Sequence, residues 1–419
     1  MRQLSQEMKK GTMHVEEVPE PALRRGGVIV RNEYSLISAG TERSSVQKRK
    51  EGLLSKAKSN PDMVKLVLNQ MRHQGVWNVY KRVMTKLEAF GPMGYSSAGT
   101  VIAVAQNVDD FAVGDRVACG GSSANHAEVL FVPKNLCVKV PEEVSMQDAA
   151  YTTLGAIALQ GVRQTAPTLG ETIVVIGLGL VGQITIQILK AAGCAVIGID
   201  LDPQSVALAR TLGADAAFQR SAGGLHADIL SHTRGHGADG VIITAATKSS
   251  DPVELAGEIA RDKARVVLVG DVGITIPRAP YYMKELDFRL SRSYGPGRYD
   301  KAYEEQGHDY PLGFVRWTER RNMEEFLRLV REKKVNVEKL TTHTFPIGNA
   351  LKAYEMIAGK KKERYIGVLL EYPPAKKSAP KTVAVAPPRE SKASLSIGFI
   401  GAGNFAQSSL LPFIDKKSV

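Results

Sequence analysis

The sequence predicts an α/β protein in which a doubly wound parallel sheet follows a β-rich domain. Over residues 151–294, apolar runs of strand length alternate with helix-like segments, as in a parallel sheet covered by helices. The run 172–176 consists of β-branched residues that are apolar from Ile173 on, as a strand buried on both faces requires, and a Gly-x-Gly-x-x-Gly motif follows it. The first ~150 residues instead hold strand-like segments between Gly, Pro and Asp turns.

Hydrophobic periodicity gives the expected elements in chain order. In the β-rich part we expect strands at 27–31, 98–105 and 127–133. The alternating part predicts strands at 172–176, 195–199, 240–244 and 265–269, and helices at 181–192, 204–212 and 252–260. Helical periodicity returns at 322–332 and 347–358, and residues 363–371 close with a strand-like run.

The glycine motif has the setting of a dinucleotide-binding turn. Gly177 permits the tight turn, Gly179 lets the backbone approach a pyrophosphate, and Gly182 lets helix and strand pack closely. Asp200 ends the next apolar run, where a carboxylate accepts hydrogen bonds from ribose hydroxyls. A packing turn in an unrelated α/β unit is the alternative. The predicted cofactor-binding residues are Gly177, Leu178, Gly179, Leu180, Val181, Gly182, Asp200, Thr244, Val269 and Gly270.

Asp200 also indicates which nucleotide binds. Its carboxylate would repel a 2′-phosphate, and residues 201–204 offer no Arg or Lys to hold one. We therefore expect NAD as the cofactor. NADP stays open as the alternative, because a basic group from elsewhere in the chain could intervene.

Composition narrows the class of protein. The 419 residues include no apolar run long enough to span a membrane, and the first residues do not form a signal peptide, so we expect a cytoplasmic protein. The three cysteines are odd in number and widely spaced, which argues against a disulfide framework and a four-cysteine zinc lobe. The formal charge of +12 lies largely in 43–86, 360–364 and 376–392, none of which carries a nucleic-acid module.

The end of the sequence predicts a linker and a second unit. Residues 373–393 combine several prolines with Lys, Ser and Ala, as solvated linkers do. Residues 394–419 then repeat a strand followed by Gly401-x-Gly403, which we interpret as the truncated start of a second nucleotide-binding fold.

Several ordered motifs over residues 11–372 resemble the medium-chain dehydrogenase/reductase superfamily of the zinc alcohol dehydrogenase type. They are residues 15–21, Val113-Gly-Asp-Arg-Val117, residues 126–133, the glycine motif with Asp200, Leu212-Gly-Ala-Asp215 and Thr342-His-Thr-Phe-Pro346. The resemblance implies a GroES-like catalytic domain built from 1–152 and 300–372, around an NAD(P)-binding Rossmann domain at 153–299.

The sequence departs from the zinc members at the three metal-ligand positions of that family. The corresponding stretches read Ala39-Gly-Thr-Glu42, Gly94-Tyr-Ser96 and Tyr151-Thr-Thr153, without a thiolate or imidazole. Catalytic zinc needs about three protein ligands, so we expect no zinc and no other metal. The chain thus resembles the zinc-independent branch, including bacteriochlorophyllide-type dehydrogenases. It also resembles the first unit of bacterial bi-domain oxidoreductases, in which a glucose-fructose oxidoreductase/inositol dehydrogenase-type unit follows; residues 401–406 resemble the start of that second unit.

Without a metal, side chains must move the proton that accompanies hydride transfer. Tyr95 stands at a ligand position of the family and Tyr151 near another, and Glu42 with Thr41 would relay a proton. A phenol needs a nearby cation to act as a base, for which Lys284 and Arg298 are the two candidates. The alternative is that each tyrosine is a core residue.

A Gly-, Tyr- and Arg-rich run at 293–300 has the composition of a ligand-binding loop. We expect Arg298, Tyr294 and Arg316 to bind a polar or anionic substrate, the alternative being a rigid packing loop. The basic insertion 43–90 carries an apolar helical stripe, which fits a core helix, a lid or an interface.

Together these features predict a zinc-independent NAD(P)-dependent oxidoreductase acting on a polar, sugar-like alcohol or ketone. A double-bond reductase of the quinone-reductase type is the enzymatic alternative, and a non-catalytic nucleotide-sensing scaffold is the other. The expected partner is a small-molecule substrate, sugar-like or anionic, and neither nucleic acid nor membrane; a homo-oligomer is left open.

Overall fold

The structure, a computed structural model, describes residues 1–7, 11–42, 90–359 and 363–374, together with Asn69, Gly403 and 405–411. The chain divides into two compact units. The larger comprises Met1–Leu4, His14–Ser44 and Pro92–Pro373, and the smaller comprises Ser5–Met13, Ser45–Gly91 and Pro374–Val419. Every site described below lies in the larger unit.

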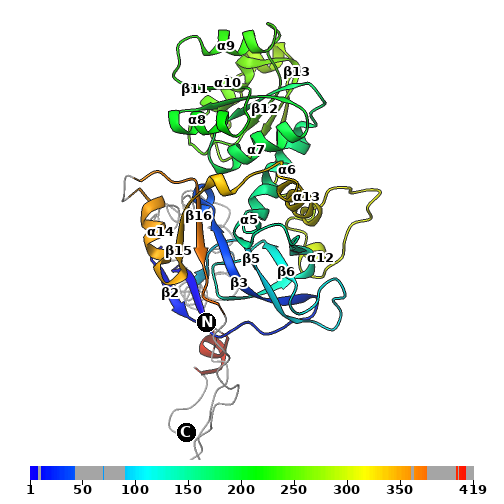
Figure 1. Cartoon of the computed structure of the whole chain (residues 1–419), viewed down its shortest axis with the longest axis vertical. Helices are drawn as coiled ribbons and strands as arrows, with labels where there is room; N and C mark the ends of the chain where they lie inside the picture. The colour runs from blue at the N-terminus through cyan, green and yellow to red at the C-terminus, as the bar shows by residue number, and fades with distance from the viewer. Residues whose placement is uncertain are drawn as a thin grey trace, which may run out of the picture. The chain divides into compact units, whose positions relative to one another are not determined.

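A six-stranded parallel sheet follows the order β11-β10-β9-β12-β13-β14 (Figure 1). Its strands are β9 (Thr172–Ile176), β10 (Ala195–Asp200), β11 (Ala216–Gln219), β12 (Ala238–Ile243), β13 (Ala260–Leu268) and β14 (Asp287–Leu290). All neighbouring strands pair in parallel. The strand order reverses between β9 and β12, and ligands of doubly wound sheets bind at such a switch point, outside the carboxyl ends of the strands.

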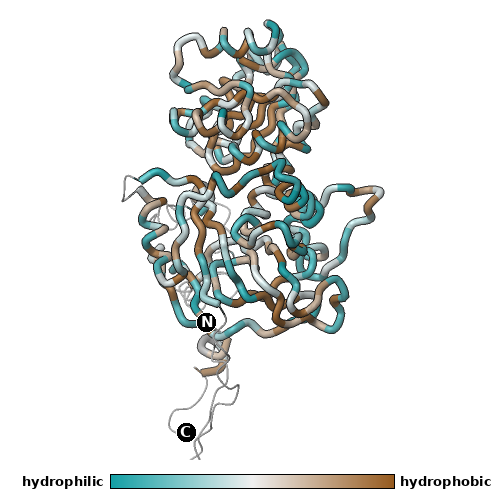
Figure 2. The backbone as a smooth tube through the Cα atoms, in the orientation of Figure 1, coloured by the Kyte–Doolittle hydropathy of each residue, from teal (hydrophilic) through white to brown (hydrophobic). Residues whose placement is uncertain are grey.

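Helices pack around this sheet as its hydrophobic strands require. They are α7 (Leu180–Ala191), α8 (Pro203–Thr211), α9 (Leu225–His232), α10 (Asp251–Ile259) and α11 (Arg278–Met283). The central strands are strongly hydrophobic (Figure 2) and buried on both faces. A local signal fixes the start of α8, where the side chain of Asp202 accepts hydrogen bonds from the backbone nitrogens of Gln204 and Ser205.

A second, mostly antiparallel sheet joins strands from both ends of the chain. Its order is β15-β16-β3-β5-β6-β8, and β7 also pairs with β3. The strands are β3 (Gly27–Ile37), β5 (Ser96–Val104), β6 (Arg116–Gly120), β7 (Val129–Pro133), β8 (Cys137–Lys139), β15 (Thr341–Pro346) and β16 (Gly367–Glu371). A small sheet of order β2-β1-β4 contains β1 (Arg2–Glu7), β2 (Met13–Glu17) and β4 (Phe90–Pro92).

Helix α6 (Thr152–Thr165) has no counterpart among the elements expected from the sequence. Gly155 and Gly161 lower its helix propensity, but close packing requires them. A Cβ on Gly155 would lie 2.1 Å from the ring of Phe326, and one on Gly161 would lie 2.5 Å from Val269. The remaining helices are α5 (Met146–Ala149), α12 (Lys301–Glu304), α13 (Glu319–Arg331) and α14 (Ala350–Ile357).

The expected fold class is confirmed, with shifted element boundaries. The expected strand at 265–269 begins at Ala260, because β13 continues across an irregularity in its pairing with β12. The expected strand at 363–371 begins only at Gly367, and a 3₁₀ turn (Ile347–Asn349) precedes α14. The short strands β11 and β14 were missed, since runs of four residues give too little periodicity.

Among the described helices, none combines the length and apolar character that a membrane span requires.

We expect Gly155→Ala to lower the free energy of unfolding by about 1–3 kcal/mol, because the added methyl group meets the fully buried ring of Phe326. Chemical denaturation measures this. Gly223→Ala is the matched control, since a Cβ there meets nothing within 4 Å. Equal stability of the two variants would contradict the packing role assigned to Gly155.

Candidate functional site

At Gly177 and Gly182 of the motif a side chain would collide with the backbone, and at Gly179 it would block the approach of a ligand to the backbone. Gly177 has a φ of +96°, and a Cβ there would lie 2.5 Å from the backbone nitrogen of Ala245. A Cβ on Gly182 would lie 2.0 Å from the carbonyl oxygen of Gly177. Around Gly179 the space is open. The turn therefore combines close packing of strand and helix with an accessible backbone, as a bound pyrophosphate requires.

The first turn of α7 offers backbone N–H groups to a ligand. Gly179, the residue that precedes the helix, supplies no side-chain cap. The N–H groups at the start of a helix have no partner within it, and the helix dipole favours an anion there. Leu180 and Val181 belong to this turn, so these residues fit the phosphates of a dinucleotide.

Asp200 ends β10 beside the glycine turn. Its carboxylate accepts hydrogen bonds from the backbone nitrogens of Leu178, at 2.5 Å, and Asp202, at 2.8 Å. A carboxylate has roughly four acceptor positions, so others remain for ribose hydroxyls. The side chain is neither fully buried nor fully exposed, which leaves it accessible at the edge of the site.

Thr244, Val269 and Gly270 follow the carboxyl ends of β12 and β13, the same edge of the sheet as the glycine turn. The hydroxyl of Thr244 donates a hydrogen bond to the carbonyl oxygen of Gly177, at 2.5 Å. A Cβ on Gly270 would lie 2.0 Å from the carbonyl oxygen of Ala245. The structure thus brings the predicted cofactor residues to one edge, where Thr244 stabilises the turn.

Tyr95 lies just before β5, close to the turn that follows β3. Its hydroxyl donates a hydrogen bond to Thr41 Oγ1, at 3.4 Å. Burial raises the pKa of the phenol above 10, and the charge of Glu42 adds to the rise. Hydrogen bonds with Ser38 and Thr41 and the positive charge of Arg298 lower the pKa. Tyr95 is therefore protonated at neutral pH and has a cation nearby that would stabilise its phenolate.

Glu42 is turned away from solvent. Its carboxylate accepts hydrogen bonds from the backbone nitrogen of Ser38, at 2.9 Å, and from the hydroxyl of Tyr354. His126 Nε2 lies 3.4 Å from Glu42 Oε2. Both side chains are almost completely buried. Glu42 therefore stabilises the backbone turn that contains Thr41. Its charge also contributes to the raised pKa of Tyr95.

The hydroxyl of Tyr151 is engaged elsewhere in the packing. It forms a 2.7 Å hydrogen bond with Thr341 Oγ1, and a Cβ on Gly367 would lie 2.1 Å from its oxygen. Tyr151 is fully buried, and burial raises its pKa. The structure does not bring this hydroxyl to the groups around Tyr95.

Lys284 is likewise held away from Tyr95. Its ammonium group donates hydrogen bonds to the carbonyl oxygens of Gly257, Glu258 and Ala260, at 2.7–2.9 Å. These carbonyls form the end of α10, so Lys284 satisfies the last turn of that helix. Of the two cations predicted to act on the phenol, only Arg298 has a charge that lowers the pKa of Tyr95.

The loop 293–300 has an unusual backbone. Positive φ angles occur at Ser293, Gly295, Gly297 and Tyr299, two of them non-glycine. Such conformations cost energy and persist only where surrounding structure holds them, often at functional sites. Here a Cβ on Gly295 would lie 2.7 Å from Asn322, and one on Gly297 would lie 2.6 Å from the ring of Tyr303.

This loop places Arg298 and Tyr294 together. Arg298 forms a 2.5 Å ion pair with Glu304, and its guanidinium lies 4.1 Å from the ring centre of Tyr299 and 5.7 Å from that of Tyr294. The Tyr294 hydroxyl and Arg298 Nε are buried without a hydrogen-bond partner. Burial raises the pKa of Tyr294 well above 10.

Glu319, the first residue of α13, adds a buried carboxyl group to this loop. It is fully buried, and neither carboxylate oxygen has a hydrogen-bond partner. Burial, and then the charge of Glu304, raise the pKa of Glu319 to about 8, against the lowering effects of Arg298 and Tyr294. The group is therefore mostly protonated at neutral pH.

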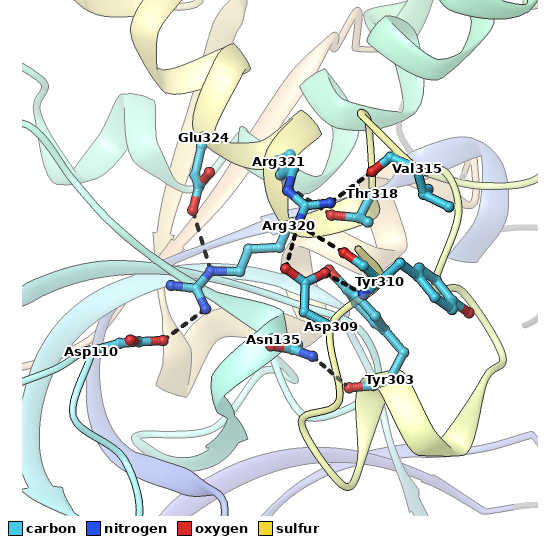
Figure 3. A network of polar contacts seen from close by, with 10 residues as sticks. All are labelled: Asp110, Asn135, Tyr303, Asp309, Tyr310, Val315, Thr318, Arg320, Arg321 and Glu324. Atoms are coloured by element: carbon cyan, nitrogen blue, oxygen red, sulfur yellow. Dashed lines mark hydrogen bonds and ion pairs between the residues drawn. The ribbon is translucent and has the colours of Figure 1, made fainter. Parts of the chain in front are cut away.

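Two arginines in the first turn of α13 hold neighbouring segments, Arg320 the segment before β6 and Arg321 the loop that leads into α13 (Figure 3). Arg320 pairs with Asp110, at 2.9 Å, and with Glu324, at 3.2 Å. Arg321 pairs with Asp309 and donates to the carbonyl oxygen of Val315, at 2.8 Å. The predicted substrate residue Arg316 is exposed and lies against the ring of Trp317.

The residues at the family's metal positions do not fit zinc. Ala39 carries no donor atom, and Tyr95 and Tyr151 are phenols whose pKa values burial raises. Within the described ranges, no group of three His, Cys, Asp or Glu side chains is placed to hold a metal ion. Proton transfer at this site is therefore assigned to side chains of the chain.

Sequence reasoning missed Ser38, His126, Glu304, Glu319 and Tyr354. His126 begins the motif at 126–133 and Ser38 precedes Ala39-Gly-Thr-Glu42, but neither motif assigns these two residues to a site, and the importance of all five comes from burial and long-range contacts. For Glu319 the only local signal is the Thr318 cap, which marks a helix start and not a buried charge. Predictions that lie outside the described residues concern the insertion 43–90, except for Asn69 and Phe90, the linker 373–393 beyond its first two residues, and most of 394–419.

A family model described as zinc-binding dehydrogenase matches residues 181–306. Two curated relatives, the D-guloside 3-dehydrogenases of Shigella flexneri and Escherichia coli, are 28% identical over 278 residues, which is 65% of this chain and 75% of each relative. The prediction that the chain is an enzyme is confirmed by these dehydrogenase homologues.

Solved structures share the fold. Galactitol-1-phosphate dehydrogenase from Escherichia coli covers 88% of this chain with all of its own length, at a TM-score of 0.67 and 20% identity. A short chain alcohol dehydrogenase from Escherichia coli CFT073, complexed with NADH, matches 88% of this chain over 99% of its own length. Its TM-score is 0.65 and its sequence identity is 20%. The chain thus has the alcohol dehydrogenase-like fold that its motifs resemble. The zinc independence and the second unit stay predictions.

We expect Glu319→Gln to weaken the pH dependence of stability. A carboxyl group whose pKa rises on folding, from 4.5 to about 8, costs no stability below pH 4.5. The cost grows as the pH rises and is complete above about pH 8, on the order of a few kcal/mol. Wild-type protein should thus lose more free energy of unfolding between pH 6 and pH 9 than Glu319→Gln does. Exposed Glu338→Gln is the control, and identical pH profiles of wild type and Glu319→Gln would contradict the assignment.

Proposed function

We propose that this chain is an NAD-dependent, zinc-independent oxidoreductase that transfers hydride to or from a polar, sugar-like alcohol or ketone. One observation carries the proposal. The carboxyl edge of the parallel sheet combines an uncapped glycine turn at 177–182 with Asp200, while Tyr95 stands where the family places a metal ligand. Such an arrangement supports nucleotide binding together with proton transfer by a phenol.

The nicotinamide cofactor, when bound, supplies or accepts the hydride. The residues of this chain have separate roles in holding it. The amides at the start of α7 would bind the phosphates, and Asp200 would accept hydrogen bonds from the ribose hydroxyls. Arg364 lies 3.5 Å from Asp202, near this end of the site, but that carboxylate offsets its charge. This supports NAD as the cofactor.

Tyr95 would move the proton. Its raised pKa keeps the phenol protonated, so in the reducing direction it donates the hydroxyl proton to the substrate oxygen as hydride reaches the carbon. The phenolate left behind is stabilised by hydrogen bonds from Ser38 and Thr41 and by the charge of Arg298. In the oxidising direction Tyr95 must first lose its own proton before it can accept that of the alcohol, so its raised pKa favours reduction at neutral pH.

Polar groups near Tyr95 support the substrate class. Arg298, whose charge acts on Tyr95, has a buried donor atom, Nε, without a hydrogen-bond partner. Donors of this kind suit hydroxyl-rich or anionic substrates. The curated relatives are named for a guloside, and one solved structure for a polyol phosphate, which agrees with that chemistry.

We expect the purified chain to bind NADH with the same affinity in the presence and absence of a chelator. The reason is that no described residue set fits zinc, whereas the glycine turn and Asp200 fit the nucleotide. Calorimetric titration measures the affinity, and elemental analysis measures the metal. Stoichiometric zinc whose removal abolishes turnover would refute the proposal.

We expect Tyr95→Phe to lower turnover about 100-fold or more, the usual reach of general acid–base catalysis, with NADH affinity unchanged. Tyr281→Phe is the matched control, because it also removes a buried, hydrogen-bonded hydroxyl, which donates to the carbonyl oxygen of Val253. That control should change stability by roughly 1 kcal/mol and leave turnover intact. If both variants turn over like the wild type on a substrate of the wild type, Tyr95 does not transfer the proton.

A further inference from the structure

Trp317 is enclosed by two arginines at the end of the loop that precedes α13. The guanidinium carbon of Arg163, from α6, lies 3.4 Å from the centre of the indole ring, and that of Arg316 lies 3.8 Å from it. Both are stacking distances, and two guanidinium groups cannot occupy the same face of one ring. The indole therefore separates the two cations.

Neither cation is neutralised by a carboxylate in the described part of the chain. Arg163 makes one hydrogen bond, from Nε to the amide oxygen of Asn322 at 2.8 Å, and Arg316 is exposed. The neighbouring arginines differ in this respect, because Arg320 and Arg321 each form an ion pair with a carboxylate (Figure 3).

The local electrostatics favour an added negative charge. The pKa of Arg163 is lowered to about 10, mainly by burial, with Glu325 opposing the shift and the charge of Arg316 contributing to it. Glu325 is itself paired with Arg328, at 2.7 Å. Two positive groups are thus held near each other at a partly desolvated position, and an anion at the edge of the indole, within reach of both, would relieve their repulsion.

We propose that Arg163, Trp317 and Arg316 form a binding site for a phosphate group, carried by inorganic phosphate or by a small phosphate monoester. Guanidinium groups present paired N–H donors that match phosphate oxygens, and the indole holds the two donors apart. A phosphate at the edge of the ring accepts hydrogen bonds from both. This site is separate from the nucleotide-binding edge and does not depend on the proposed oxidoreductase activity.

The site has a physical link to the strained loop. Asn322 accepts the Nε hydrogen of Arg163 and donates from its own amide nitrogen to the carbonyl oxygen of Tyr294, at 2.8 Å. Fixing Arg163 by a bound anion would therefore also fix Asn322 and the start of that loop. Occupancy of the site should thus raise thermal stability as well as change the environment of Trp317.

Trp317 itself reports on binding. The chain has two tryptophans, so Trp77→Phe leaves Trp317 as the only one. In this background, inorganic phosphate titrated at constant ionic strength should change the fluorescence saturably, while chloride should not. Arg316→Gln and Arg163→Gln should each weaken the phosphate affinity at least about tenfold, since each removes charged donors.

The control is Arg278→Gln, which removes an arginine stacked 4.3 Å from the ring of Tyr282 and should leave the affinity unchanged. Titration with glucose 6-phosphate distinguishes the sources, because tighter binding than inorganic phosphate identifies a monoester site. A linear response, an equal response to chloride, or an unchanged affinity in the exposed Arg316→Gln variant would overturn the proposal. NADH binding, measured on the same samples, tests the nucleotide site separately.

Discussion

The contact between Gly155 and the ring of Phe326 is the constraint on which the candidate site depends. It sets the distance between α6 and α13, since a single added carbon would lie 2.1 Å from the ring. At that spacing Asn322 of α13 reaches Arg163 of α6 and the carbonyl oxygen of Tyr294. The loop 293–300, with Arg298, is thereby held in a backbone conformation that isolated residues would avoid. Helix packing, and not the loop's own sequence, therefore positions the polar groups beside Tyr95.

Two buried carboxyl groups of the larger unit show how differently a fold can treat one chemical group. Glu42 accepts hydrogen bonds from a backbone nitrogen and a phenol and lies beside an imidazole, so its negative charge is compensated. Glu319 receives no hydrogen bond that compensates its burial, and the protonated form is favoured. Glu42 is thus a hydrogen-bonded carboxylate near Tyr95. Glu319 is instead a carboxylic acid that loses its proton above neutral pH.

The sequence predicts the parallel sheet and its glycine turn because those features are local. A buried strand, a turn and a helix start depend on neighbouring residues, so Gly177 and Asp200 could be identified from spacing alone. Helix α6 was missed because its two glycines oppose helix formation until α13 packs against it. The same limit applies to the site. The sequence could not decide between Lys284 and Arg298 as the cation that acts on Tyr95, because the binding of Lys284 to the end of α10 depends on residues far apart in the chain.

The pairing of β16 with β3 has a consequence for biosynthesis. Val368 lies opposite Ile37, so the hydrogen-bonding edge of Tyr34–Ile37 has no partner until more than 300 further residues have left the ribosome. At about 5–20 residues per second this takes tens of seconds. The parallel sheet, whose strands all lie within 172–290, can meanwhile assemble without that edge. During translation the nascent chain thus exposes a strand edge while the parallel sheet can already form, and a chaperone that shields such edges would protect it from aggregation.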